Sequence, residues 1–316
     1  MPTLARLLAG PHRVAAVVSQ PDRPRGRGRK SSPAPVAALA LAAGVRLLRP
    51  ERVGDPAVIA GLAHVAPDLG VVVAFGQFLP RSVRELPKLG YSINAHASLL
   101  PRHRGAAPIA HAILAGDAET GISIMRVERE MDAGAVCLVR RTPIAADETR
   151  GALEERLAAL AADAVADAID AIAAGRARFD AQDGARATLA PKLGPADAAL
   201  DFARPAGELA RRVRALAPRP GAVAQLGSER LRILAARVEP GPPDRAPGAV
   251  QRAGAALRVA TSDGWLVLER LQRPGGRPLP VADFLRGFDV PDAARLERPA
   301  SAREDAARED ADAAPD

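Results

Sequence analysis

The stretch PDLGVVVAFG (residues 67–76) decides the fold class that the sequence predicts. Its centre is an uninterrupted apolar run, which is typical of a parallel strand covered on both faces. Upstream, RVAAVVSQ (13–20) and VRLLRP (45–50) are predicted strands, and APVAALALAAG (34–44) between them is a predicted helix. Strands that alternate with helices indicate an α/β domain with a doubly wound, Rossmann-like parallel sheet.

The alternation continues downstream to about residue 178, which we take as the end of the first domain. The predicted elements are a helix in DPAVIAGLAHV (55–65), a strand in GYSINAHA (90–97), a helix in APIAHAILAG (107–116), a strand in TGISIMRVE (120–128) and a long amphipathic helix over 151–175.

The pattern changes in the second half of the chain. Residues 179–199 have little periodicity and are predicted to be a linker. One helix (205–218) and five short β-like runs separated by Gly- and Pro-rich turns follow, so residues 200–288 predict a small OB-like β-barrel. The last segment, 289–316, is rich in Ala, Arg and acidic residues and predicts a disordered tail.

Composition restricts the function only loosely. The 316 residues carry a net charge of +7, with a pI near 10.7, which favours a polyanionic partner. The single cysteine, Cys137, cannot form an intrachain disulfide, so a reducing compartment is expected. The sequence shows neither a membrane-spanning run nor a signal peptide, and we expect a cytoplasmic protein. No His or Cys spacing predicts a metal site.

The run INAHASLLPRHRGAAPI (93–109) carries the chemistry. Asn94 and His96 leave a predicted strand at its carboxyl end, where doubly wound sheets bind their ligands. An amide can stabilise a carbonyl oxygen on which charge develops, and His96 can move a proton near neutral pH. Asp132, after the next strand, would orient it. With no activated Ser or Cys nearby, the pattern favours direct acyl transfer to an amine.

This run and GDAETGISIMRVEREMDAGAV (116–136) resemble the formyltransferases that use 10-formyltetrahydrofolate. Further similar segments follow in order, and the order is most similar to family members that act on methionyl-tRNA. These segments are VAAVVSQPDRPRGRGRK (14–30), VVVAFGQFLP (71–80), LAPKL (189–193), ALDFARPAGELARRVRALAPRPGA (199–222) and ATSDG (260–264).

The resemblance implies transfer of a formyl group from 10-formyltetrahydrofolate to the amino group of methionyl-initiator tRNA, by a monomer. It implies Asn94, His96 and Asp132 as the catalytic residues. The implied folate contacts are Ser98, Leu99, Leu100 and Pro101, together with Phe75 and Gly76 at the pterin pocket.

A basic loop, RPRGRGRK (23–30), is the expected contact with tRNA. Its arginines offer phosphate-binding forks, and it lacks the Lys-Ser/Thr ending of a nucleotide-binding P-loop. The implied tRNA contacts are Arg23, Arg25, Arg27, Arg29 and Lys30 in this loop, Arg104 near the aminoacyl end, and Arg211, Arg212, Arg214, Arg230 and Arg232 in the barrel.

The amino-terminal end departs from the family pattern, which begins with a strand and a Gly-Thr-Pro turn. This sequence begins inside that region, so we expect the first strand to be missing because a start site about a dozen residues upstream was overlooked. Two alternative functions stay open. One is formyl transfer to a small amine, such as a sugar nucleotide or glycinamide ribonucleotide, and the other is a catalytically impaired tRNA-binding protein.

Overall fold

The computed structural model describes residues 1–25, 30–292 and 294–300. The chain divides into two compact units, each described here by itself. Unit 1 contains Met1–Pro108, Glu119–Pro143 and Glu154–Ala190, and unit 2 contains Ile109–Ala118, Ile144–Leu153 and the chain from Pro191 onward. In the described residues, no helix is both long and apolar enough to cross a membrane.

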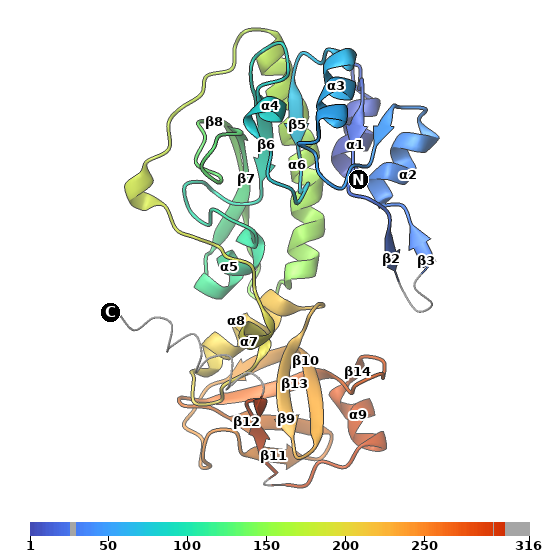
Figure 1. Cartoon of the computed structure of the whole chain (residues 1–316). Coiled ribbons are helices and arrows are strands. Elements are labelled where there is room, and N and C mark those ends of the chain that lie inside the picture. The colour runs from blue at the N-terminus through green and yellow to red at the C-terminus, as the bar shows by residue number, and fades with distance from the viewer. Residues whose placement is uncertain (26–29, 293, 301–316) are drawn as a thin grey trace, which may run out of the picture. The chain divides into compact units, whose positions relative to one another are not determined.

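Unit 1 is built around a four-stranded sheet in the order β5-β6-β7-β8 (Figure 1). A separate parallel pair is formed by β1 and β4, and a hairpin by β2 and β3. The strands are β1 (Val17–Val18), β2 (Arg23–Arg25), β3 (Lys30–Ser32), β4 (Leu47–Leu48), β5 (Gly70–Val72), β6 (Ser92–His96), β7 (Glu119–Arg126) and β8 (Val136–Pro143). The helices are α1 (Pro2–Leu8), α2 (Pro35–Ala42), α3 (Pro56–Val65), α4 (Arg81–Arg84) and α6 (Arg150–Ala173), whose first turn lies in unit 2.

The doubly wound fold class is confirmed, with one correction to strand direction. β5 and β6 run parallel, but β7 runs antiparallel to β6, and β8, which the sequence did not predict, runs antiparallel to β7. An apolar run reports burial and not direction, so the pattern could not distinguish these arrangements. The buried side chains Ile93, Ile122 and Ile124 belong to this sheet. On α6, Leu157, Ala161, Val165 and Ala168 are also buried, at helical spacing.

Unit 2 is an antiparallel half-barrel sheet in the order β11-β12-β13-β10-β9-β15, with β14 paired to β13. Its strands are β9 (Ala222–Leu226), β10 (Glu229–Glu239), β11 (Val250–Ala253), β12 (Ala256–Ala260), β13 (Trp265–Gln272), β14 (Leu279–Pro280) and β15 (Leu296–Glu297). Its helices are α5 (Pro108–Ala115), α7 (Pro195–Ala198), α8 (Ala206–Leu216) and α9 (Val281–Gly287). The predicted small OB-like domain is confirmed in this form.

The core of unit 2 explains why α8 lies on the sheet. Leu209, Val213 and Leu216 recur at helical spacing and are almost fully buried in one cluster with Ile233 and Leu257 of the strands. The predicted disordered tail starts too early. Leu296 is 2% exposed in that core, and β15 pairs with β9, whereas residues 301–316 lie outside the described residues. A lone apolar residue carries no periodicity from which such a strand could be predicted.

Candidate active site

The end of β6 places the first two candidate residues. Asn94 and His96 are two positions apart on a strand, so their side chains point to the same face of the sheet. Asn94 is half-buried, and its amide makes no hydrogen bond with another described residue. Asn94 of β6 pairs in register with Val72 of the parallel strand β5, so the segment that follows β5 begins at the same end of the sheet. The site therefore has an available amide donor at the carboxyl ends of two parallel strands.

His96 is buried and contacts two different loops. Its Nε2 lies 2.8 Å from the carbonyl oxygen of His103, which can only accept, so this nitrogen carries a hydrogen. Its Nδ1 lies 3.5 Å from Oδ2 of Asp132. The exposed fractions of the His96 and Asp132 side chains are 6% and 13%. Nδ1 and the carboxylate therefore form the pair that can exchange a proton in this site.

The Asp132 loop has an unusual backbone. Asp132 has φ +54°, a left-handed conformation that Asp tolerates better than most residues. Its carboxylate accepts a hydrogen bond of 2.9 Å from the backbone N–H of Gly105. Gly134, two residues on, packs its backbone directly against the backbone of Arg126, and a Cβ atom there would collide with it. The loop is thus held at both its side chain and its backbone.

The turn after His96 is fixed from within. The Ser98 hydroxyl donates to the carbonyl oxygen of Arg102 at 2.6 Å, and Ser123 of β7 donates to the carbonyl of Ser98 at 2.7 Å. The backbone N–H of Leu100 in turn donates to the Ser123 hydroxyl. Ser98 is fully buried, whereas Leu99, Leu100 and Pro101 are half-buried. Four residues of this turn were predicted to contact folate. One of them, Ser98, is buried inside the turn, and its hydrogen bonds stabilise the conformation of the turn.

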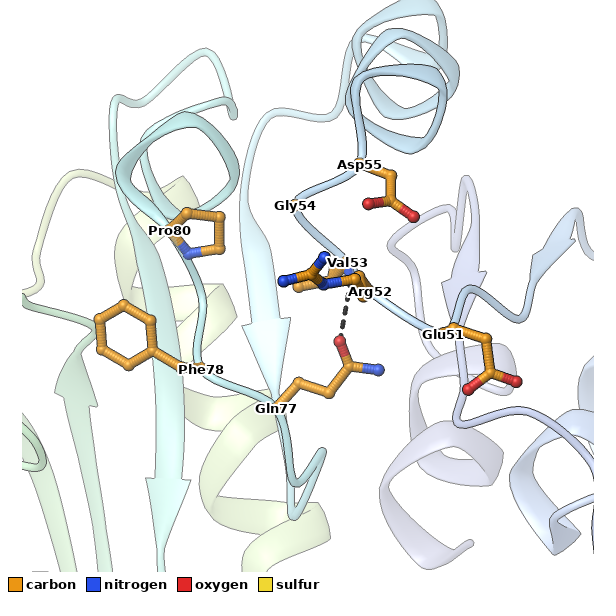
Figure 2. Close-up of a pocket in the computed structure, with 8 residues that line it drawn as sticks. All are labelled: Glu51, Arg52, Val53, Gly54, Asp55, Gln77, Phe78 and Pro80. Atoms are coloured by element: carbon orange, nitrogen blue, oxygen red, sulfur yellow. Dashed lines mark hydrogen bonds between the residues drawn. The ribbon is translucent and has the colours of Figure 1, made fainter.

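The predicted pterin segment leaves β5. The carbonyl of Phe75 accepts a hydrogen bond from Gln20, and Gly76 has φ +77°, which favours glycine. Figure 2 shows the Gln77 side chain pointing toward Val53, and its Oε1 accepts a hydrogen bond of 2.8 Å from the backbone N–H of Val53. A cavity of about 580 Å³ lies here, lined by Glu51, Arg52, Val53, Gly54, Asp55, Gln77, Phe78 and Pro80. Its lining residues do not include Asn94, His96 or Asp132.

A segment that the sequence predicted to be linker forms part of the site. We call residues 179–190 the strap. Gln182 donates from Nε2 to the carbonyls of Asp132 and Gly134, at 2.8 Å each, and accepts from Arg104. The Thr188 hydroxyl accepts a hydrogen bond from the backbone N–H of His103, and the Thr188 carbonyl accepts one from the backbone N–H of Arg104, at 2.8 Å each. Such contacts leave no periodic signal, and the sequence did not indicate them.

The residues predicted to contact tRNA are spread over both units. Arg104 is 9% exposed, and its guanidinium is occupied by Gln182 and Glu130. In unit 2, burial lowers the pKa of Arg214, with Arg211 nearby adding to the effect. Arg23 and Arg25 belong to β2 and Lys30 belongs to β3, whereas Arg27 and Arg29 lie outside the described residues. Arg211 donates to the carbonyl of Leu114, and Arg212 donates to the carbonyl of Asp197. Arg230 and Arg232 are on β10.

Two further features concern chemistry other than acyl transfer. Cys137 on β8 is partly buried, and burial raises the pKa of its thiol to about 11, so it is a poor nucleophile at neutral pH. Among the described residues, no three His, Cys, Asp or Glu side chains are grouped to hold a metal ion.

Comparison with known proteins decides the family. The sequence pattern of the family described as formyl transferase matches residues 4–169, and that of the formyl transferase C-terminal domain matches residues 192–289. The chain belongs to the formyltransferase family. The methionyl-tRNA formyltransferase of Pseudomonas paraeruginosa is 47% identical over 282 residues, which cover 89% of this chain and 90% of that protein. The methionyl-tRNA formyltransferase of Roseiflexus castenholzii is 44% identical over 93% of this chain and 94% of its own.

Solved structures of two other proteins share the fold. An N-formyltransferase from Helicobacter canadensis, in complex with folinic acid and dTDP-3-aminofucose, has a TM-score of 0.63 at 15% identity. The match covers 86% of this formyltransferase and 94% of that chain. HypX from Aquifex aeolicus, in complex with tetrahydrofolic acid, has a TM-score of 0.57 at 18% identity over 79% of this chain and 43% of its own.

Proposed function

We propose that this formyltransferase transfers the formyl group of 10-formyltetrahydrofolate to the amino group of methionyl-initiator tRNA. The observation that carries the proposal is the arrangement at the end of β6, where the Asn94 amide and the His96–Asp132 pair occupy one sheet edge. Relatives named methionyl-tRNA formyltransferase match about nine-tenths of the chain at 47% and 44% identity, which supports tRNA as the acceptor.

Asn94 acts on the formyl oxygen in this mechanism. The folate co-substrate supplies the formyl carbon, which the amino nitrogen of the acceptor attacks. Negative charge then develops on the formyl oxygen, and the half-buried Asn94 amide donates a hydrogen bond that stabilises it. Since the Asn94 amide has no partner among the described residues, no existing bond is broken when it donates.

His96 and Asp132 handle the proton. As the new N–C bond forms and the bond from the formyl carbon to folate N10 breaks, one proton must leave the amine and one must reach N10. Nε2 of His96 is held by the His103 carbonyl, so Nδ1 is the atom that can take up or release this proton. Asp132, 3.5 Å away and fixed by the Gly105 N–H, stabilises the protonated ring.

The edge beside these residues fits a folate. Phe75 and Gly76 follow β5 directly, and the positive φ of Gly76 turns the chain without a side chain in the way. The half-buried Leu99, Leu100 and Pro101 offer an apolar wall on the β6 side. An aromatic pteridine with polar edges suits apolar walls and backbone groups of this kind. We assign these five residues to folate contact, and Ser98 to the shape of the turn.

The acceptor tRNA would lie against basic residues of both units. We propose that the 23–30 loop contacts the acceptor end and that the arginines of β10, Arg230 and Arg232, contact the stem by phosphate binding. The net charge of +7 supports a polyanionic partner. We further propose that the enzyme acts as a monomer, because Asn94, His96 and Asp132 all come from one unit of one chain. We propose a cytoplasmic location because its relatives are named as enzymes that act on methionyl-tRNA.

The test is a release assay for tetrahydrofolate with three acceptors. The purified chain is given 10-formyltetrahydrofolate and methionyl-tRNA, a dTDP-amino sugar or glycinamide ribonucleotide, with His96→Ala as the inactive control. We expect release with methionyl-tRNA only. Release with a small amine, undiminished by competing tRNA, would establish the small-amine alternative. Binding of tRNA without release at saturating folate would establish the impaired tRNA-binding protein.

A further inference from the structure

We propose that Gln182 of the strap is a positioning residue for formyl transfer, which holds both partners of His96 in place. This inference rests on the proposed function, because its readout is the rate of that reaction. The carboxamide has two functional halves, a donor half and an acceptor half, and each half holds a different loop of the site. Gln182 itself touches none of the reacting atoms in this assignment and acts through Asp132 and Arg104.

The donor half holds the Asp132 loop. Nε2 of Gln182 donates to the carbonyl oxygens of Asp132 and Gly134 at 2.8 Å each, so both of its hydrogens are used. The loop needs such a support because Asp132 is in a left-handed conformation, with φ +54°. Residues in sparsely populated conformations persist only where their surroundings fix them. Without these two bonds, the carboxylate of Asp132 would lose its fixed direction toward His96.

The acceptor half holds the loop of residues 103–105. Oε1 of Gln182 accepts from Nε and Nη2 of Arg104 at 3.1 and 2.8 Å, and the Arg104 side chain is only 10% exposed. On either side of Arg104, the carbonyl of His103 accepts from His96, and the N–H of Gly105 donates to Asp132. His103 also has a positive φ, at +57°. Anchoring the Arg104 guanidinium therefore fixes both neighbouring contacts of the catalytic pair.

The strap can serve as a support because it is itself anchored at both ends. At its start, the Phe179 ring lies 4.2 Å from the guanidinium of Arg126, and the backbones of Asp180 and Val136 exchange two hydrogen bonds of 2.9 Å. At its end, Thr188 accepts the backbone N–H of His103, and Ala190 donates to the carbonyl of Arg104. At its start, the strap is therefore held by residues of β7 and β8, which lie outside the two loops that Gln182 holds.

Two substitutions test the two halves of the amide. Gln182→Glu keeps acceptors for Arg104 but replaces the donated hydrogens with an oxygen that faces two carbonyls. Gln182→Met removes both halves at similar volume. We expect each to lower kcat by ~10–10²-fold, because misplacement by about 1 Å costs this much. We expect KM for folate and for methionyl-tRNA to stay within about threefold, since groups that contact substrate are unchanged.

Asp183→Ala is the matched control on the strap. The Asp183 carboxylate accepts the N–H of Ala185 at the start of a single 3-10 turn, η1 (Gly184–Arg186), and is exposed. We expect wild-type kcat from it. The thermal midpoint of every variant is measured, and a purely structural role of Gln182 would lower that midpoint while leaving kcat of the folded enzyme unchanged.

The outcomes distinguish this inference from the proposed function. Wild-type enzyme that fails to formylate methionyl-tRNA overturns the proposed function. Active wild-type enzyme with a Gln182→Glu variant whose kcat is within twofold overturns the inference, and so does a loss confined to KM. If Gln182→Met does not fold, Gln182→Glu, which retains the Arg104 acceptors, decides the question by itself.

Discussion

His96 and Asp132 face each other across 3.5 Å, from Nδ1 to Oδ2, in a site where both side chains are largely buried. Two loops and one strand of unit 1 meet at this contact, because Gly105 donates to the same carboxylate oxygen. A carboxylate held in this way orients the imidazole and stabilises its protonated form. In the proposed mechanism, this contact determines that Nδ1 of His96 exchanges the proton.

Asp132→Asn tests the charge of this pair with little change in shape. An asparagine oxygen can still accept the Gly105 N–H, so the loop should keep its position. We expect kcat to fall by ~10²–10⁴-fold, because the protonated imidazole loses its counter-charge. Single-turnover formylation measures this effect directly. A rate constant within threefold of wild type would remove Asp132 from the proton transfer.

Asn94→Ala tests the stabilisation of the formyl oxygen. We expect kcat to fall by ~10²–10³-fold, the usual cost of losing one such donor. The affinity for methionyl-tRNA, measured by filter binding, should change little because the proposed mechanism assigns Asn94 to the formyl group and not to the tRNA. Asn94→Ala enzyme with normal turnover would show that another group binds the formyl oxygen.

Gly105→Ala tests how tightly the strap closes on the site. Gly105 has φ +124°, and a Cβ atom there would lie 2.7 Å from the carbonyl oxygen of Ala190. We expect a loss of unfolding free energy of roughly 1–3 kcal/mol together with reduced kcat. Gly184→Ala is the control, since no atom lies within 4 Å of the added Cβ and no positive φ is required. Equal unfolding midpoints for the two variants would contradict this account.

The basic loop is tested through salt dependence. Replacing Arg25, Arg27 and Arg29 with Ala should weaken tRNA binding and flatten the dependence of log Kd on log salt, because fewer counterions are released. Replacing the same three residues with Lys keeps the charge and should preserve the slope. An Ala variant with the wild-type slope would place the loop outside the tRNA interface.

Cys137 offers a test by pH. Burial raises its thiol pKa to about 11, so only a small fraction is thiolate at pH 8. The rate of alkylation by iodoacetamide in the folded enzyme should keep rising up to about pH 11. A plateau near pH 9, the value of an ordinary thiol, would show that the thiol is solvated.

Much of the fold followed from sequence, and the particular failures have physical causes. The predicted helices over 151–175 and 205–218 match α6 and α8 within two residues at each end. Long periodic segments carry this information. The direction of β7 could not be predicted, because an apolar run reports burial and not strand direction. The strand β8 was not predicted, because it alternates only weakly and has exposed arginines such as Arg140 and Arg141.

The sequence also predicted only some of the residues that form the candidate site. Asn94, His96 and Asp132 form a recognisable spacing, and the structure brings His96 and Asp132 together. Gln182 and Thr188 lie 50 and 85 residues along the chain from Asp132 and His103, whose backbone atoms they bind. Bonds of that kind place no demand on the neighbouring residue types, and so no local pattern in the sequence predicted them.

The central claim is tested most directly by incubating the purified 316-residue chain with 10-formyltetrahydrofolate and methionyl-initiator tRNA, beside the His96→Ala variant. The predicted result is N-formylmethionyl-tRNA from the wild type, with the rate lowered by ~10²–10⁴-fold in the variant. Folded wild-type protein that binds both substrates and forms no N-formylmethionyl-tRNA would contradict the account.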